Sequence, residues 1–196
     1  MNKGVAAMVW FIGLGIVAVL LLYAIVIYNA LVNLKHAVSK SWSNIDVLLK
    51  QRNEELPKLV ETCRQYMQFE RDTLERVMAA RQGAQLAQQK GDVSGIGKSE
   101  SVIRSALGSI TATVEAYPEL AANASIQTLL SRVTALENAI SDRREFYNES
   151  VNVLNVRIEQ VPDVIIARMT GFQAATLLEF PAEDLRNPDI KALFQN

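Results

Sequence analysis

The sequence predicts an all-α protein, with an N-terminal transmembrane helix followed by an antiparallel helical bundle of long helices. Residues 4–28 form one uncharged apolar run. After this run, apolar residues recur at spacings of three and four, which places them on one face of an α-helix. Glycine and proline are scarce, with 9 and 5 in 196 residues, so few residues would break a helix. Together these observations favour helices over sheets.

The apolar run from Gly4 to Tyr28 is long enough to cross a membrane as a helix. Its 25 residues rise about 1.5 Å each, which covers a hydrocarbon core of roughly 30 Å. Trp10 and Tyr28 lie near its ends, where aromatic residues meet the membrane interface. A cleaved signal peptide usually has a hydrophobic core of about 7–15 residues and a small-residue cleavage site. This run is longer and has no clear site. We therefore expect residues 1–30 to be an uncleaved signal anchor; a cleaved signal and a buried soluble helix are the alternatives.

The charges beside the run favour one orientation. Lys3 precedes the run, whereas Lys35 and Lys40 follow it. Cytoplasmic flanks of membrane spans carry the excess of Lys and Arg. The pattern therefore favours a single-pass protein with its bundle in the cytoplasm.

Residues 31–172 are expected to form the bundle. An apolar stripe starts at Val38 and continues in steps of three and four, which is typical of a bundle or coiled-coil seam. It predicts one helix from the membrane to about Gln89. The stripe shifts in phase near Arg52, and Pro57 lies at this point. A proline inside a helix removes a backbone hydrogen bond, so we expect a bend near Pro57.

The sequence from Gly91 to Ser99, GDVSGIGKS, is predicted to be an inter-helix loop. Its end resembles the close of a phosphate-binding loop. The full motif needs a glycine where Asp92 stands, and no strand precedes it. A mobile turn is therefore the preferred interpretation.

Two further helices are expected, over 100–116 and 126–160. The first ends at Tyr117, because a residue that precedes proline is disfavoured in helical geometry. Asn123 or Ser125 can cap the second helix. Helices of such unequal length do not make a bundle of matched lengths.

Two shorter segments complete the chain. An apolar segment over 163–169 follows Pro162 and ends at Gly171. Residues 173–196 are expected to be a C-terminal extension that packs loosely.

Composition excludes several function classes. The chain has 20 Lys and Arg against 21 Asp and Glu, so no basic excess indicates nucleic-acid binding. Its single cysteine, Cys63, forms no intramolecular disulfide. Because Cys63 lies on the apolar stripe, we expect a buried structural role rather than a reactive thiol.

Several polar side chains lie on or beside the apolar stripes. Arg144, Asn148 and Asn155 share one helix face with Tyr147. The others are Asp46, Glu61, Glu70, Arg81 and Glu137. A buried polar group is costly unless it is hydrogen-bonded. We therefore expect the carboxylates of one helix to pair with Arg144 and the asparagines of another, as a structural polar network that fixes helix register. A partner-binding surface and a ligand site are the alternatives.

The residue inventory does not support an enzyme. Di-iron bundles need two Glu-x-x-His pairs, but the chain has one histidine, His36, which we expect near the membrane interface. There is no zinc spacing, no convincing Ser-His-Asp or Cys-His set and no glycine-rich nucleotide fingerprint. We expect a protein that is not an enzyme, with no catalytic, cofactor-binding or metal-binding residues.

Six stretches of the chain occur in a recognisable order and spacing. They are YNALV at 28–32, SWSNIDVLLKQRNEELPKLVE at 41–61, FERDTLERVMAAR at 69–81, VEAYPEL at 114–120, LENAISDRREFYNESVNVLN at 136–155 and VPDVIIARMTGF at 161–172. Over nearly the whole chain, they resemble the LemA family of bacterial membrane-anchored proteins. Val161 departs from the family, which usually has an aromatic residue there, and the sequence after Phe172 lacks the usual run of aromatic residues.

The resemblance implies one N-terminal transmembrane helix, an antiparallel bundle and no catalytic activity. It also implies a role in membrane organisation, since one relative takes part in building magnetosome membranes. We expect the chain in the bacterial cytoplasmic (inner) membrane. The leading hypothesis is a non-catalytic scaffold that binds copies of itself, as a homo-oligomer, or an unidentified membrane protein. The alternatives are an accessory subunit of a membrane protease or transporter, and a ligand or signal sensor that uses polar residues of the bundle core.

Overall fold

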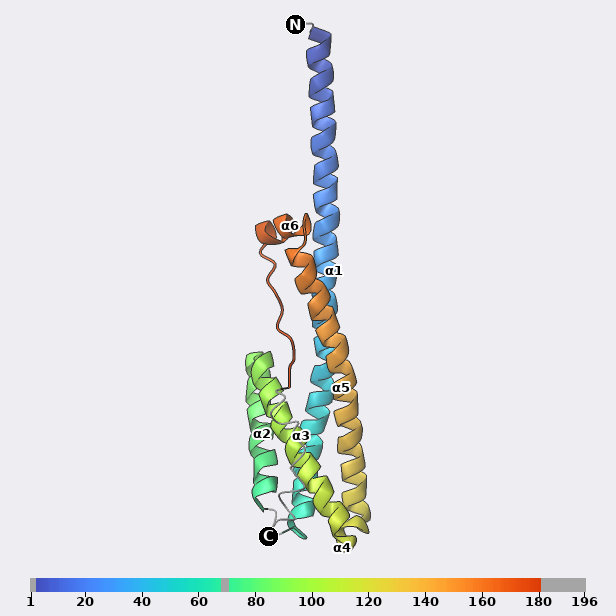
Figure 1. Ribbon diagram of the computed structural model, residues 1–196, viewed down its shortest axis with the longest axis vertical. Coiled ribbons are helices and arrows are strands. Elements are labelled where there is room, and N and C mark those ends of the chain that lie inside the picture. The colour runs from blue at the N-terminus through green and yellow to red at the C-terminus, as the bar shows by residue number, and fades with distance from the viewer. Residues whose placement is uncertain (1–2, 68–70, 181–196) are drawn as a thin grey trace, which may run out of the picture. The chain divides into compact units, whose positions relative to one another are not determined.

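The structure, a computed structural model, describes residues 3–67 and 71–180, with side chains from residue 8 onward (Figure 1). Every regular element in these two ranges is an α-helix, which confirms the predicted all-α class. The helices are α1 (Lys3–Arg64), α2 (Arg71–Lys90), α3 (Val93–Ala116), α4 (Pro118–Ala121), α5 (Ala124–Glu159) and α6 (Asp163–Thr170).

The chain divides into two compact units, each built from two segments. Of the described residues, 3–40 and 149–175 form one unit, here called the anchor unit. Of the described residues, 41–67, 71–148 and 176–180 form the other, the bundle unit. Helices α1 and α5 contribute residues to both units, whereas α2, α3 and α4 belong to the bundle unit alone.

The bundle unit closes around one apolar core. Buried side chains of α1, α2, α3, α4 and α5 meet there, among them Leu56, Val77, Ile110 and Val133. Burial of a side chain of this size contributes roughly 1.5–3 kcal/mol, so the shared core is a main source of the unit's stability.

The first bundle helix ends earlier than predicted. Helix α1 stops at Arg64, and the amides of Tyr66 and Met67 donate to the Cys63 carbonyl at 2.9 and 2.8 Å. Pro57 lies inside α1. The prediction of one helix to Gln89 is therefore wrong, because the chain turns after α1 and continues as α2. The turn allows apolar residues on both sides of it to enter the same core.

The glycine-rich segment contains a helix start rather than a complete loop. Gly91 has a positive φ of 67°, which glycine adopts at little cost. Helix α3 then begins at Val93, and the Gly95 amide donates to Oδ1 of Asp92 at 2.9 Å as an N-terminal cap. The prediction of a loop through Ser99 is wrong, because this cap starts the helix within the segment.

Helices α5 and α6 begin and end close to the predicted residues. The amides of Ser125 and Ile126 donate to Oδ1 of Asn123 at 3.0 and 3.2 Å, so Asn123 caps α5. Helix α6 ends at Gly171, which has a φ of 75°. This left-handed residue is a common helix terminator and confirms the predicted end.

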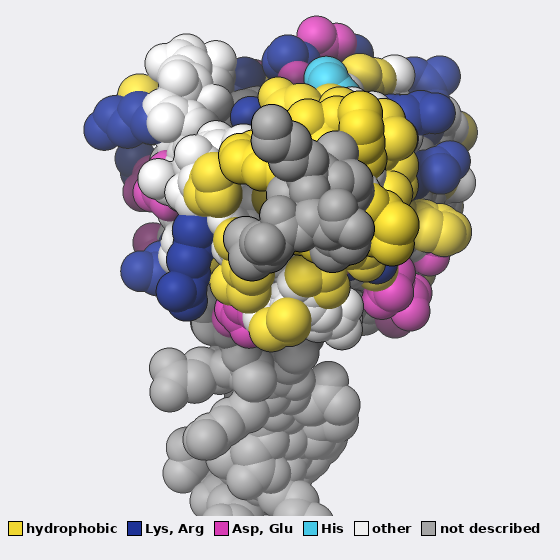
Figure 2. Space-filling model, turned by 90° about the horizontal axis from the view of Figure 1, so that it is seen from above, with side chains coloured by type: hydrophobic (Ala, Val, Ile, Leu, Met, Phe, Trp, Pro, Cys, Tyr) yellow, Lys and Arg dark blue, Asp and Glu magenta, His cyan; other side chains and the backbone are white. Residues whose placement is uncertain are grey.

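The anchor unit carries the apolar run. Within the described residues, α1 is long and apolar enough to cross a membrane. Gly4 lies in this helix, Trp10 is 79% exposed and Tyr28 is 43% exposed. Seen from above, hydrophobic side chains gather around the N-terminal end of α1 (Figure 2). An exposed apolar surface of this size is typical of a membrane-spanning segment.

Helix α6 packs against α1 inside the anchor unit. Ile27 and Leu31 of α1 form a small buried cluster with Ala167 of α6. The rings of Tyr28 and Phe172 meet edge to face, with centroids 6.1 Å apart. Helix α6 lies across the direction of α1 (Figure 1).

Candidate functional site

A buried ionic cluster joins three helices of the bundle unit. Arg52 of α1 is 0% exposed, and Glu100 of α3 is 3% exposed. The two terminal nitrogens of Arg52 donate to the two carboxylate oxygens of Glu100, with Nη2 to Oε1 at 2.5 Å. Nη1 also donates to Oε1 of Glu137, on α5, at 2.6 Å. A forked arrangement of this kind is the strongest form of Arg–carboxylate contact.

A second arginine balances the charge of this cluster. Arg104 of α3 donates from Nε to Oε2 of Glu137 at 3.3 Å. Two positive and two negative side chains are therefore joined, which compensates for their removal from water. Burial disfavours the charged form of Arg52, but the charges and hydrogen bonds of Glu100 and Glu137 outweigh it and raise the pKa of Arg52. Arg52 stays charged, and the cluster cross-links α1, α3 and α5.

Beside this cluster, α5 binds the backbone of the segment that follows α6. Nδ2 of Asn148 donates to the Leu178 carbonyl at 3.1 Å, and the Leu178 amide donates to Oδ1 of Asn148 at 2.8 Å. The Tyr147 hydroxyl donates to the Thr176 carbonyl at 2.8 Å. In the anchor unit, Asn155 forms the same pair of bonds with Ala175, at 2.9 and 2.8 Å. We call residues 172–180 the tail segment.

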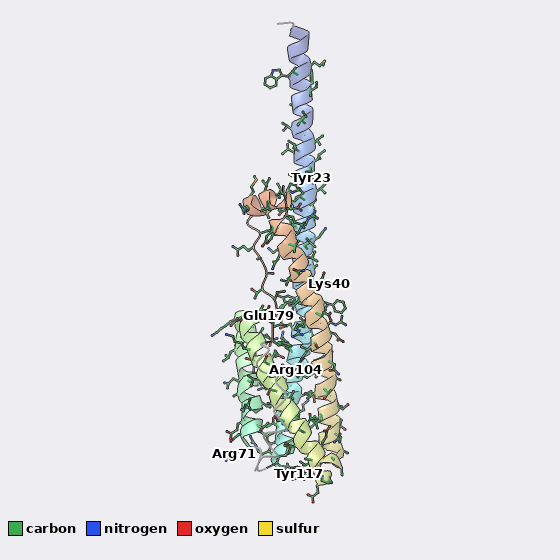
Figure 3. The ribbon with its side chains drawn as sticks, viewed as in Figure 1. Tyr23, Lys40, Arg71, Arg104, Tyr117 and Glu179 are labelled. Atoms are coloured by element: carbon green, nitrogen blue, oxygen red, sulfur yellow. The ribbon has the colours of Figure 1, made fainter. Side chains whose placement is uncertain are left out.

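The tail segment also packs closely in the bundle unit. Leu178 is 0% exposed. A Cβ added at Gly97 of α3 would collide with the carbonyl oxygen of Glu179, which Figure 3 labels. Gly97 is therefore needed inside a helix for a close backbone approach. The prediction of a loosely packed extension is wrong for residues 173–180, and residues 181–196 lie outside the described part of the chain.

The end of the tail segment connects it to the ionic cluster. The guanidinium carbons of Arg144 and Arg104 lie 4.3 and 5.1 Å from the centre of the Phe180 ring. Contacts of this kind attract a cation to the face of the ring. Burial and the nearby charge of Arg104 lower the pKa of Arg144. Arg104 thus contacts both Glu137 and the tail segment.

Eight of the nine predicted polar residues lie in the described ranges, and these eight do not form one network. Glu137 joins the ionic cluster, and Tyr147, Asn148 and Asn155 bind the tail segment. The expected pairing of Arg144 with a carboxylate of another helix is replaced by its contact with Phe180. The physical reason is that the tail segment lies against this part of α5 and supplies the backbone partners.

The remaining predicted residues lie elsewhere. Nζ of Lys50 donates to Asp46 at 2.6 Å, and Gln88 also donates to Asp46. Nε of Arg81 donates to the Asn53 carbonyl at 2.7 Å. Glu61 pairs with exposed Arg64 at 3.4 Å and joins neither arrangement. Glu70 lies outside the described residues.

Arg52 and Glu100, the central pair of the ionic cluster, were not identified from the sequence. Arg52 lies three residues after Leu49 and four before Leu56, so it occupies a core position of the stripe. That spacing was the available signal. Nothing in the local pattern distinguishes Glu100 from the other carboxylates, because its ion pair is formed with Arg52 of another helix.

The described side chains offer little for catalysis or metal binding. In the described ranges, no group of three or more His, Cys, Asp or Glu side chains could hold a metal ion. Burial raises the pKa of the Cys63 thiol to about 11, and Cys63 is 0% exposed. A thiol of this kind is a poor nucleophile at neutral pH.

Comparison with known proteins gives the family. MamQ 2 and MamQ 1 of Paramagnetospirillum magneticum, both named magnetosome proteins, are 27% identical to the chain over 182 residues. The magnetosome protein MamQ of Magnetospirillum gryphiswaldense is 24% identical over 181 residues. Each match covers 80% of this chain and 66% of the relative, so the chain spans just under two thirds of their length. The sequence profile of the LemA family matches residues 41–192, and the chain belongs to the LemA family.

Proposed function

We propose that the chain is a non-catalytic, membrane-anchored scaffold whose bundle binds copies of itself or other membrane proteins. The observation that carries this proposal lies on α1. Its first part exposes large apolar side chains from Met8 to Tyr28, and its last part, from Leu56 to Cys63, lies in the bundle core. Helix α1 thus contributes both the proposed membrane anchor and part of the bundle core. Similarity to proteins named for the magnetosome supports a role in organising a membrane.

Self-association is tested by the mass of the full chain. Light scattering of the protein in mild detergent, with the detergent contribution subtracted, gives the number of protomers. A scaffold that assembles with itself gives one discrete mass of several protomers. A monomer contradicts self-association and leaves the binding of another membrane protein.

Support for a partner site comes from a cavity in the bundle unit. It has a volume of about 320 Å³, and its lining includes Tyr66, Met67 and Tyr117. Tyr66 is 53% exposed and Tyr117 is 58% exposed. Exposed tyrosines beside a cavity are typical of protein interfaces. Figure 3 labels Tyr117.

Photo-crosslinking in native membranes tests this surface. A photoreactive amino acid at Tyr117 is expected to trap one dominant product, and the same amino acid at exposed Arg132 is the matched control. A product that contains a protease or transporter favours the accessory-subunit alternative. Equal, diffuse products from both positions contradict a specific surface.

We place the anchor in the bacterial inner membrane and the bundle on its cytoplasmic side. Support comes from Lys35 and Lys40, which follow the apolar run and are exposed. The test is a Gln82→Cys variant, because Gln82 is exposed on α2 and the native Cys63 is buried. An impermeant maleimide should label Cys at 82 only after spheroplasts are permeabilised. Labelling of intact spheroplasts would reverse the orientation.

A sensor function is supported by one polar cavity. It has a volume of about 490 Å³, and its lining includes Asp46, Asn53, Arg81 and Gln88. Oδ1 of Asn53 is buried and has no hydrogen-bond donor among the described groups. Such an atom usually has a partner, which a ligand could provide. A thermal-stability screen against ions and metabolites tests this, since a ligand of the native state raises Tm. The Asn53→Leu variant should lose the effect, and a flat screen counts against a sensor.

A further inference from the structure

Helix α6 exposes apolar side chains that the fold of the anchor unit leaves uncovered. Ile165 and Met169 are 56% and 78% exposed. They are four residues apart and therefore share one face of the helix. Val161, just before α6, is 82% exposed. Large apolar side chains grouped in this way mark an interaction surface.

The position of α6 indicates what covers this surface. A helix needs about 20 apolar residues to cross a bilayer core, and the run from Gly4 reaches that length at Tyr23. Figure 3 labels Tyr23 on α1 beside α6. The next residues of α1, including Ile27, contact α6. Helix α6 is therefore attached to α1 where the membrane span ends.

The direction of α6 and the basic side chains near it are those expected of a helix that lies on a membrane surface. Helix α6 lies across α1 (Figure 1), and a helix across a spanning helix lies along the membrane plane. Arg168 on α6 is exposed. Lys35 lies near Phe172, with Nζ 6.0 Å from the ring centre. Basic side chains beside an apolar helix face are attracted to anionic lipid headgroups.

We propose that α6 is an interfacial helix that inserts Val161, Ile165 and Met169 into the headgroup–acyl boundary of the leaflet next to it. The inference rests on the membrane anchorage proposed above. It gives the protein a second membrane contact, formed more than 100 residues after the first in the sequence. Helix α6 contacts α1 at Ile27 and Leu31, next to the exposed apolar residues of α1 that end at Tyr28, which is why lipid and not a protein partner is assigned to it.

Spin labelling of the full chain tests the proposal. The chain is placed in nanodiscs of phosphatidylethanolamine and phosphatidylglycerol, in a Cys63→Ala background. Single labels are attached through Ile165→Cys and Met169→Cys. Thr170→Cys is the matched control, because Thr170 is exposed on another face of the same helix, and Leu20→Cys reports on the span. Power saturation then compares collisions with oxygen, which concentrates in lipid, and with a water-soluble nickel chelate.

The expected result is a several-fold higher ratio of oxygen to nickel accessibility at 165 and 169 than at 170, with position 20 also in lipid. If 165 and 169 favour nickel while position 20 favours oxygen, the inference is overturned and the anchor stands. If position 20 also favours nickel, the anchorage fails and the inference fails with it. If neither reagent reaches 165 and 169, a protein covers α6 and the inference is overturned. Brominated-lipid quenching of Ile165→Trp fluorescence, measured against Thr170→Trp with Trp10 and Trp42 both replaced by phenylalanine, repeats the comparison without a spin label.

Discussion

Replacement of Arg52 by methionine measures how strongly the ionic cluster holds the bundle unit together. The change keeps a long side chain but removes three hydrogen bonds, two to Glu100 and one to Glu137. Glu137 retains Arg104 at 3.3 Å, whereas Glu100 loses its described ionic partner. Because a charge is then buried without compensation, we expect a loss of about 3–5 kcal/mol.

Thermal unfolding of the full chain in detergent, followed by circular dichroism at 222 nm, measures this loss. For a chain of this size each kcal/mol shifts Tm by about 2–4 °C, so Tm should fall by roughly 6–20 °C. The matched control is Lys50→Met, which breaks an exposed pair with Asp46 at 2.6 Å and should cost about 1 kcal/mol or less.

A double variant distinguishes the cost of leaving Glu100 without an ionic partner from the cost of losing the packing of the Arg52 side chain. Adding Glu100→Leu to Arg52→Met removes the stranded carboxylate. Because a buried ion pair replaced by apolar side chains is often neutral in stability, Tm should recover most of the loss. A single variant within about 0.5 kcal/mol of the parent, the usual range for surface changes, would show that the cluster is not buried as described. A double variant that is no better than the single one would show that packing, not charge, sets the loss.

Four further predictions concern the tail segment, helix α3 and the core. Asn148→Ala should weaken the tail segment by about 1–3 kcal/mol, from two hydrogen bonds of about 0.5–1.5 each, and hydrogen exchange of the Leu178 amide should speed up accordingly. Gly97→Ala should lower Tm, because overpacking costs about 1–3 kcal/mol. Gly108→Ala, with open space around it, should raise Tm, since alanine favours a helix interior. Burial raises the pKa of Cys63 from 9.0 to about 11. Its stabilising contribution is therefore complete below pH 9 and is lost as pH rises through 11, and alkylation at pH 8 should be much slower in the native than in the unfolded protein.

The helical architecture could be predicted because it depends on local pattern. Spacings of three and four define a helix face wherever they occur. Caps are similarly local, and Asn123 could be named in advance as one of two possible caps of α5. The end of α6 at Gly171 follows from the same kind of local chemistry.

The turn between α1 and α2 could not be predicted from that pattern. Cys63 and Leu74 continue one regular stripe across it, and no glycine or proline lies between them. Both side chains are buried in the same core. A straight helix and a turned pair of helices therefore share the same sequence pattern, and only packing between distant segments separates them.

The hydrogen-bond partners of the polar residues could not be predicted from the local sequence pattern either. The spacing of Asn148 and Asn155 correctly places both on one helix face, but a side-chain amide can bond a carboxylate or a backbone equally well. The observed partners, Leu178 and Ala175, are backbone groups of a segment with no pattern of its own. Arg52 could have been noticed as a charged residue in a core position, but its carboxylates come from two other helices.

The unequal helix lengths have a simple explanation in the two units. Helices α2 and α3, with 20 and 24 residues, belong only to the bundle unit. Helix α5 has 36 residues because it serves both units, with Asn148 in the bundle unit and Asn155 in the anchor unit. Each of these asparagines binds the tail segment within its own unit. The length of α5 therefore follows from its packing in both units, whereas α2 and α3, which are similar in length, pack against each other within the bundle unit.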